Sequence, residues 1–317
     1  MPSVAITEFT DPGCPFAFSA EPHRWRLRWL FGDQLRWRER MVVLAEARED
    51  YTAKGFTAEK VAQSSGKLAE RYGMPMSEEV KPAVAATLPA CRAVVAARLH
   101  APEKAWLLLR RLRHLNFATS DGASTPGGAS GTPMGTGGTP MGTGGTPMGT
   151  GGRLLDDPET IAQAAADVGL EPAELAAWSA EEATELALRE DMLLARDPTA
   201  AALALTHKLA TIPEGGWRYT CPSLEFRTAG GAAFSAPGFQ SSLAYETALA
   251  NVEPGLERRP EPEDVAEVLA WAGVPLATAE VAELCGGSRD KAREKLQAAG
   301  AVEEPVGRDA FWTLAAA

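Results

Sequence analysis

The N-terminal residues 4–44 carry two strand-like patterns separated by a helical one. Residues 4–9 form a short β-branched run closed by a Thr-Asp-Pro-Gly turn, which predicts a buried strand. Apolar and aromatic side chains then recur at helical spacing as far as Phe31, and residues 35–44 alternate as a strand does. This order predicts a right-handed βαβ unit whose strands are parallel.

Helical periodicity then predicts an all-helical insertion at 58–209. The individual helices are expected over 58–72, 78–99, 102–117, 158–168 and 180–209. Three copies of Thr-Pro-Met-Gly-Thr-Gly-Gly occupy residues 132–152, after further Gly, Ser and Pro residues. Such a segment cannot bury enough apolar area to offset the entropy of ordering it, so we expect a disordered loop at 120–153.

A hairpin pattern follows the helical block. Residues 223–227 and 232–235 are predicted strands around an Ala-Gly-Gly turn, and a helix is expected over 241–252. A hairpin added to a parallel pair gives a mixed sheet covered by helices. The sequence therefore predicts one α/β domain, formed by residues 1–57 and 210–255 around the insertion.

The C-terminal residues 260–317 follow a Pro-rich linker and are predicted to form a separate unit. Helices are expected over 263–272, 278–285 and 288–299, with a strand at 310–314, and this arrangement resembles a winged helix-turn-helix. The third helix carries four cations, but the unit contains eleven acidic residues against five basic ones. DNA-binding modules are usually basic, so we expect a packing or protein-interaction module and no nucleic-acid partner.

Composition and the positions of the cysteines limit the expected partners, the compartment and the metal chemistry of the protein. The formal net charge is −11 and the pI about 5.0, so no general field attracts nucleic acid or anionic lipid. The chain shows neither a secretory leader pattern nor about 18 consecutive apolar residues, and we expect a cytoplasmic protein without a membrane partner. The cysteines have no C-x-x-C or zinc-ligand spacing, which predicts free thiols and no metal site.

Cys14 is the candidate nucleophile. It follows the first predicted strand and precedes Pro15, which suits the first turn of a helix. Unpaired N–H groups and the positive end of the helix dipole stabilise a thiolate at such a position. The alternative is a buried cysteine that acts as a small apolar residue. Cys91 and Cys285 are expected to be packing residues.

Cys221-Pro222 immediately precedes the third strand of the predicted domain, where proline is tolerated. A cis bond here would place the loop against the N-terminus of the first helix and offer backbone to an extended ligand. An ordinary trans proline is the alternative. The basic and aromatic residues 24–29 are expected to form a solvated helix face, with an acidic thiol ligand as the other interpretation.

Taken in order, these motifs resemble the DsbA-like thioredoxin family, with its 2-hydroxychromene-2-carboxylate isomerase and kappa-class glutathione transferase relatives. The likeness covers about residues 4–252 and rests on Asp11, Cys14-Pro15-Phe16, the helical insertion, Pro222 and the terminal hairpin and helix. It implies a thioredoxin-like fold and thiol–disulfide chemistry in which Cys14 attacks. It also implies that Pro222 is the family's cis-proline and that Pro15, Phe16 and Thr220 border the substrate groove.

One residue departs from the family pattern. Ala17 stands where such oxidoreductases usually carry the second cysteine of C-x-x-C. A mixed disulfide at Cys14 must then be resolved by a small thiol, another protein or a different cysteine. The thioredoxin plan places the residue before the cis-proline opposite the attacking cysteine, so Cys221 is the candidate. The two thiolates could instead share a metal site across a homodimer.

The resulting hypothesis is a thiol–disulfide oxidoreductase with a single-cysteine Cys-Pro-Phe-Ala site. Its substrate would be a protein or small-molecule disulfide, with no bound cofactor and a low-molecular-weight thiol as co-substrate. One alternative is a thiol-dependent isomerase or transferase, although those relatives use a hydroxyl residue where Cys14 stands. The other is a non-catalytic binding module or redox-sensing regulator.

Overall fold

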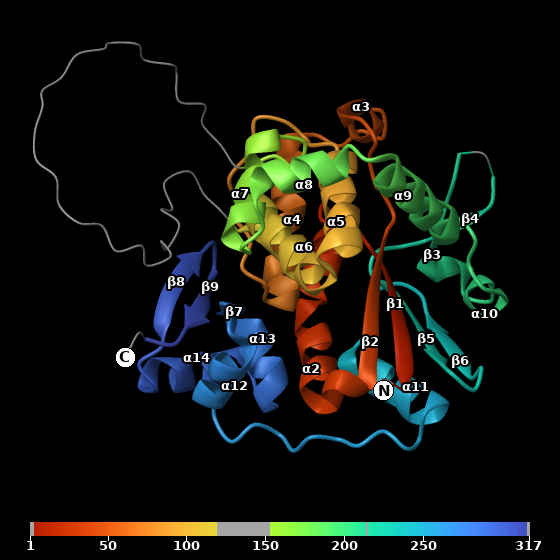
Figure 1. Ribbon diagram of the computed structural model, residues 1–317. Helices are drawn as coiled ribbons and strands as arrows, with labels where there is room; N and C mark the ends of the chain where they lie inside the picture. The colour runs from red at the N-terminus through yellow and green to blue at the C-terminus, as the bar shows by residue number, and fades with distance from the viewer. Residues whose placement is uncertain (1–2, 119–152, 214, 316–317) are drawn as a thin grey trace, which may run out of the picture.

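A mixed sheet forms the centre of the computed structural model, which describes residues 3–118, 153–213 and 215–315 (Figure 1). Its strand order is β2-β1-β5-β6, with β1 parallel to β2 and antiparallel to β5. Ile6 on β1 lies between Trp37 and Phe226 in register. This arrangement confirms the βαβ unit and the hairpin expected from the sequence. The strands are β1 (Val4–Thr10), β2 (Leu35–Met41), β5 (Ser223–Thr228) and β6 (Ala233–Ala236).

Two helices follow β1 where the sequence predicts one. The helix is interrupted at Ala20. Pro22 then occupies the first turn of the second helix, where its missing N–H costs no hydrogen bond. The second helix packs beside the C-terminal helix of the α/β domain. These elements are α1 (Pro15–Ser19), α2 (Glu21–Phe31), the 3₁₀ turn η1 (Gly32–Gln34) and α11 (Ser242–Val252).

The insertion forms a helical layer above the sheet in Figure 1, and one of its helices packs against β2. The helix expected over 78–99 begins only at Leu88, because Pro82 and Pro89 lack the N–H that a helix interior needs. Pro89 is tolerated in the first turn of the shorter helix. The predicted disordered loop, 120–153, lies outside the described residues except for Arg153. The helices are α3 (Arg48–Thr52), α4 (Ala58–Tyr72), α5 (Leu88–His100), α6 (Pro102–Phe117), α7 (Pro158–Asp167), α8 (Pro172–Ser179), α9 (Glu182–Ala195) and α10 (Ala200–Leu203).

The end of the long helix expected over 180–209 is replaced by shorter helical elements, and a small second hairpin follows them. The helix α9 ends at Ala195 and Pro198 follows, which prevents its continuation. The short η2 (Thr206–Lys208) then leads into two antiparallel strands that the sequence did not predict, β3 (Leu209–Thr211) and β4 (Trp217–Tyr219). This hairpin brings the chain to the start of β5.

The C-terminal unit contains three helices and a sheet of order β7-β9-β8 within the described residues. Only the last strand was expected from the sequence. The order helix, strand, helix, helix, strand, strand is typical of winged-helix domains, and that classification stays a prediction. The elements are α12 (Val265–Ala272), β7 (Leu276–Ala277), α13 (Thr278–Cys285), α14 (Arg289–Ala298), β8 (Val302–Val306) and β9 (Asp309–Thr313).

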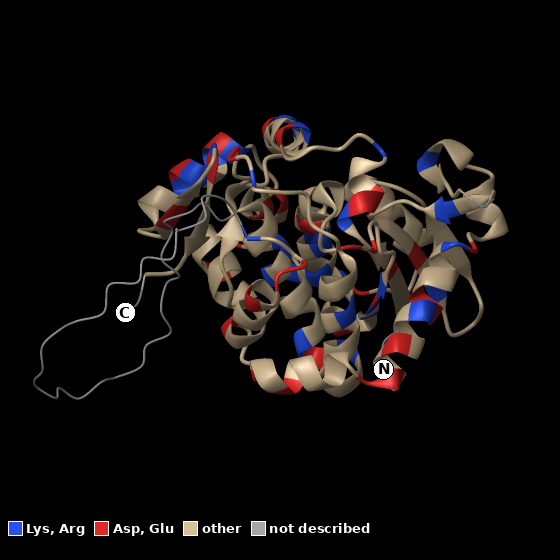
Figure 2. Ribbon diagram, turned by 90° about the horizontal axis from the view of Figure 1, so that it is seen from above, with Lys and Arg blue, Asp and Glu red and all other residues tan. Residues whose placement is uncertain are grey.

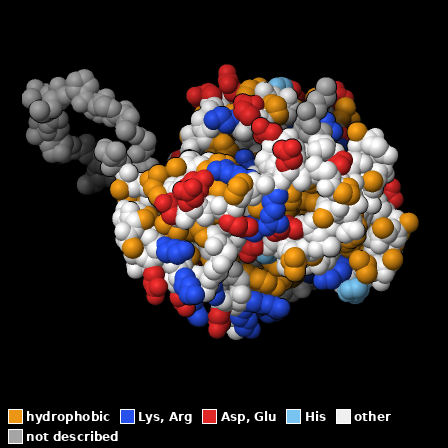
Figure 3. Space-filling view, turned by 90° about the horizontal axis from the view of Figure 1, so that it is seen from below, with side chains coloured by type: hydrophobic (Ala, Val, Ile, Leu, Met, Phe, Trp, Pro, Cys, Tyr) orange, Lys and Arg blue, Asp and Glu red, His pale blue; other side chains and the backbone are white. Residues whose placement is uncertain are grey.

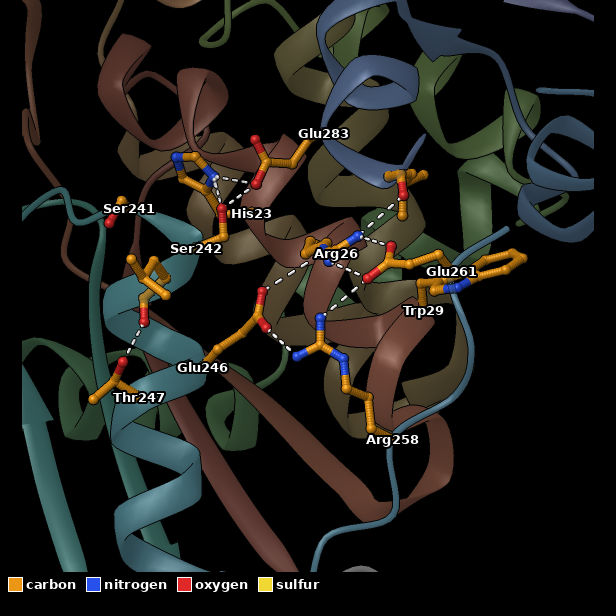
Figure 4. A network of polar contacts seen from close by, with 12 residues as sticks. His23, Arg26, Trp29, Ser241, Ser242, Glu246, Thr247, Arg258, Glu261 and Glu283 are labelled. Atoms are coloured by element: carbon orange, nitrogen blue, oxygen red, sulfur yellow. Dashed lines mark hydrogen bonds and ion pairs between the residues drawn. The ribbon is translucent and has the colours of Figure 1, made fainter. Parts of the chain in front are cut away.

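The C-terminal unit packs against α2 through apolar and polar contacts. The ring of Trp271 meets those of Trp25 and Trp29 edge-on, at centroid distances of 5.4 and 5.0 Å. Figure 4 shows Arg26 of α2 bonded to Glu261, with an Nη2–Oε1 distance of 2.6 Å, and to Glu246 of α11. One continuous core cluster contains residues of both units, so the C-terminal unit forms one packed body with the α/β domain.

Buried charges connect α2 to its surroundings, which corrects the expectation of a solvated face at residues 24–29. Arg24 is 7% exposed and bonds to Glu8 of β1 and Glu39 of β2. Arg110 of α6 bonds to Glu21 at the start of α2 and to Glu280 of α13. Burial disfavours the Arg110 charge, but these two carboxylates outweigh it and raise the pKa of the guanidinium.

Positive and negative residues are interspersed in the views of Figures 2 and 3. Figure 2 shows Lys and Arg interspersed with Asp and Glu over the ribbon, and the face in Figure 3 carries both signs beside apolar side chains. Among the described helices, none is both long and apolar enough to cross a bilayer.

Replacing Arg110 by methionine tests the buried network. The substitution keeps much of the side-chain length but leaves Glu280 without its guanidinium partner, so the free energy of unfolding should fall by about 3–5 kcal/mol. Urea denaturation of the full chain measures this change. Arg189→Met is the matched control because Arg189 pairs with Glu185 at the surface, and it should cost less than about 1 kcal/mol. Equal losses in both variants would contradict a structural role for the network.

Candidate active site

Cys14 caps the N-terminus of α1, as the sequence predicts. Its backbone is extended, with φ −89° and ψ 112°, and its carbonyl oxygen accepts a hydrogen bond from the Phe18 N–H at 3.1 Å. The preceding turn is tight, because the Gly13 N–H donates to Asp11 Oδ1 at 2.7 Å. A Cβ atom on Gly13 would lie only 2.6 Å from a methyl carbon of Thr87. Glycine is therefore required here by close packing.

The loop before β5 lies against this helix start. The Cys221-Pro222 bond is cis, which confirms the sequence prediction, and Cys14 Sγ lies 3.3 Å from the Cys221 carbonyl oxygen. Ser223 fixes the loop, since its hydroxyl donates to the Thr220 carbonyl at 2.6 Å and accepts from the Gly238 N–H at 2.8 Å. The Thr220 hydroxyl donates to the Lys208 carbonyl at 2.7 Å.

The pKa values of the two thiols are shifted in opposite directions. A hydrogen bond from the Cys221 thiol is the main cause that lowers the pKa of Cys14; burial opposes it, and the Ala17 and Phe16 N–H groups add to it. Burial raises the pKa of Cys221 well above that of a free thiol, and the bond to Cys14 raises it further. While Cys14 is neutral, its thiol donates a hydrogen bond to the Cys221 carbonyl oxygen. Once Cys14 ionises, the Cys221 thiol donates to it.

Asp11 connects this turn to the surrounding elements. Its Oδ2 atom accepts hydrogen bonds from the Leu44 N–H and the Thr87 hydroxyl, both at 2.9 Å, and from the Cys91 thiol at 3.5 Å. Burial raises the pKa of the Asp11 carboxyl, and burial beside Asp11 raises the pKa of Cys91 well above its ordinary value. Cys91 is packed in the core as expected. Its contact with Asp11 was not visible in the sequence, because α5 is distant along the chain.

Cys14 and Cys221 are both more buried than the sequence suggested. Cys14 is 5% exposed and Cys221 is 7% exposed. They belong to an apolar cluster with Phe9 and Tyr219, whose rings stack at a centroid distance of 4.2 Å. Leu209 of the β3–β4 hairpin belongs to the same cluster. The unpredicted hairpin thus contributes Leu209 and Tyr219 to the apolar cluster that contains both thiols.

Aromatic side chains border the open side of α1. Phe16 is 42% exposed, and its ring lies 6.4 Å from that of Tyr72 and 6.5 Å from that of Phe239. Pro15 is half-buried and Pro222 is buried. Tyr72 and Phe239 were missed by sequence reasoning, since each lies in an unrelated segment and becomes a neighbour of Phe16 only in the folded chain.

The polar contacts of His23 are to α11 and α13 rather than to the two thiols. The Nδ1 atom of His23 is 3.0 Å from the Ser242 hydroxyl and 3.6 Å from Glu283, which joins α2 to α11 and α13 (Figure 4). Within the described ranges, no group of three or more His, Cys, Asp or Glu residues is placed to hold a metal ion. Each of the four cysteines is a free thiol.

Comparison with solved structures identifies the fold. A candidate protein disulfide isomerase from Nitrosomonas europaea matches with a TM-score of 0.51 at 12% identity, over 78% of this chain and 97% of that one. A candidate DsbA oxidoreductase from Streptomyces coelicolor matches with a TM-score of 0.50 at 16% identity, over 82% and 94%. The chain has the thioredoxin-like fold of DsbA-like proteins. No protein-family model matches the sequence, and no curated protein does.

Removing the Cys221 thiol should make Cys14 less acidic. Cys221→Ala keeps the carbonyl at residue 221 but deletes the donor that lowers the pKa of Cys14. Iodoacetamide alkylation of the Cys14 peptide, followed by mass spectrometry against pH, should reach its midpoint at higher pH in the variant. Cys285→Ala serves as the control and should leave the Cys14 profile unchanged. An unchanged profile in Cys221→Ala would show that the helix N-terminus alone sets the acidity.

Proposed function

We propose that the protein is a thiol–disulfide oxidoreductase in which Cys14 is the nucleophile. The observation that carries the proposal is the position of Cys14 at the start of α1, with its sulfur 3.3 Å from the carbonyl oxygen of the residue before Pro222. The lowered pKa of Cys14 supports it, because the thiolate is the form that attacks a disulfide.

In the proposed reaction, the Cys14 thiolate attacks one sulfur of a protein or small-molecule disulfide. A bond forms between Cys14 Sγ and that sulfur while the substrate S–S bond breaks, and the other half of the substrate leaves as a thiolate. The Ala17 and Phe16 N–H groups stabilise the Cys14 charge before the attack. The electrons that return the enzyme to its starting state come from a low-molecular-weight thiol, which acts as co-substrate rather than as a resident cofactor.

The substrate would approach over Pro15 and Phe16 and meet the loop of Thr220 and Pro222. The exposed Phe16 ring, with Tyr72 and Phe239 beside it, offers an apolar platform next to the nucleophile. Limited exposure of Cys14 favours a slender disulfide, such as one at the end of a flexible chain or in a small molecule. A reducing compartment such as the cytoplasm suits an enzyme whose cysteines are all free thiols.

Loss of the Cys14 sulfur should abolish turnover. Cys14→Ala retains a small apolar residue at the helix start but has no nucleophile, so the reduction of a model disulfide in the presence of glutathione should fall to the uncatalysed rate. Oxidation of NADPH by glutathione reductase reports that rate continuously. Cys285→Ala should retain the activity of the unmodified chain, because Cys285 lies in the C-terminal unit. Equal activity in Cys14→Ala would reject the proposal.

A further inference from the structure

The position that usually supplies the resolving thiol is filled by Ala17, which is 2% exposed and chemically inert. A mixed disulfide at Cys14 must therefore be attacked by some other thiol. Cys14 is only 5% exposed, so an external thiol reaches its sulfur less easily than a thiol that the fold already holds nearby. A thiol already held beside that sulfur would have a large advantage in effective concentration.

Cys221 is the cysteine that lies beside Cys14. Its carbonyl oxygen is 3.3 Å from Cys14 Sγ, and both residues belong to the same apolar cluster. A hydrogen bond from the Cys221 thiol is also the main cause of the lowered pKa of Cys14. The Cys91 thiol instead bonds to Asp11, and Cys285 ends α13 in the C-terminal unit. We propose that Cys221 resolves the mixed disulfide, so that a Cys14–Cys221 disulfide across the loop replaces the missing C-x-x-C disulfide. This inference rests on the proposed function.

The step balances as a two-electron exchange. Cys14 first carries one half of the substrate as a mixed disulfide, with the other half released as a thiolate. The Cys221 thiol gives its proton to the thiolate released in the first attack. The resulting Cys221 thiolate attacks Cys14 Sγ, forming the Cys14–Cys221 bond and breaking the bond to the second substrate sulfur, which leaves as a thiolate. The substrate disulfide has been reduced to two thiols and the enzyme dithiol oxidised. Two molecules of a low-molecular-weight thiol reduce the enzyme and become a disulfide themselves.

The charges at the site order the two attacks. In the free enzyme, the hydrogen bond to Cys14 and the negative charge of Cys14 both help to raise the pKa of Cys221, after burial. Both of these contributions vanish once Cys14 is bound to a substrate sulfur, while burial and Asp11 still raise the pKa of Cys221 and nearby Arg218 lowers it. The Cys221 thiol should therefore lose its proton more readily in the mixed disulfide than in the free enzyme. Burial and the neighbouring Asp11 carboxyl raise the pKa of Cys91.

Trapping the intermediate tests the inference. The reduced full-length protein is treated with one equivalent of oxidised glutathione, quenched with acid, alkylated, digested without reductant and analysed by mass spectrometry. We expect a cross-linked Cys14–Cys221 peptide and release of both glutathione molecules. In Cys221→Ser the Cys14–glutathione adduct should become the dominant species, and steady-state turnover should fall by at least about tenfold.

The matched control is Cys91→Ser, which removes a neighbouring buried thiol and should still yield the Cys14–Cys221 peptide. A stable Cys14–glutathione adduct in the unmodified protein, or a Cys14–Cys91 peptide, would overturn the role of Cys221 and leave the proposed function standing. If Cys14 forms neither an adduct nor a cross-link, the proposed function fails as well. The experiment on the unmodified protein decides between these outcomes even if a variant does not fold.

Discussion

The burial of charge along α2 is the constraint on which the arrangement of this protein depends. Glu21, at the start of the helix, is 1% exposed and bonds to Arg110 and Arg113, both of which are also buried. Taking one such ion out of water costs several kcal/mol unless partners surround it, so these carboxylates and guanidinium groups can be buried only together. Since α6, α2 and α13 each supply a member, the network fixes their relative positions. The active-site turn is joined to α2 through the five-residue helix α1, so the network also limits where that turn can lie.

The active site also depends on contacts between distant segments. A helix N-terminus alone provides N–H groups to Cys14, but the largest influence on its acidity is the Cys221 thiol. Asp11 works in the opposite direction, because its charge would destabilise a thiolate nearby, and burial keeps that carboxyl harder to ionise. The site therefore holds one negative charge readily and a second only with difficulty. Such an arrangement favours a single thiolate at rest.

Local sequence patterns were sufficient to predict the four-stranded sheet and the positions of Cys14 and Cys221 beside it. A β-branched run, a Pro-Gly turn and a Cys-Pro helix start are short-range signals, and the Cys-Pro dipeptide before a strand is another. Residues 24–29 show where such reasoning fails. A run of arginines on a helix normally indicates solvent, and only folding brings Glu8, Glu39 and the C-terminal carboxylates to them. The β3–β4 hairpin was missed because its strands are only three residues long.

Three arginines of the C-terminal unit are held by acidic or backbone groups. Arg293 of α14 bonds to Glu303 and Asp309 of the same unit, while Arg308 bonds to Glu78 and Arg289 donates to the Glu70 carbonyl. These three arginines, committed to such contacts, are poorly placed to neutralise phosphates, which is what non-specific nucleic-acid binding requires. The same unit supplies Glu280 and Trp271 to the far side of α2. Its physical effect in this structure is therefore to complete the packing of α2, the second helix after the active-site turn.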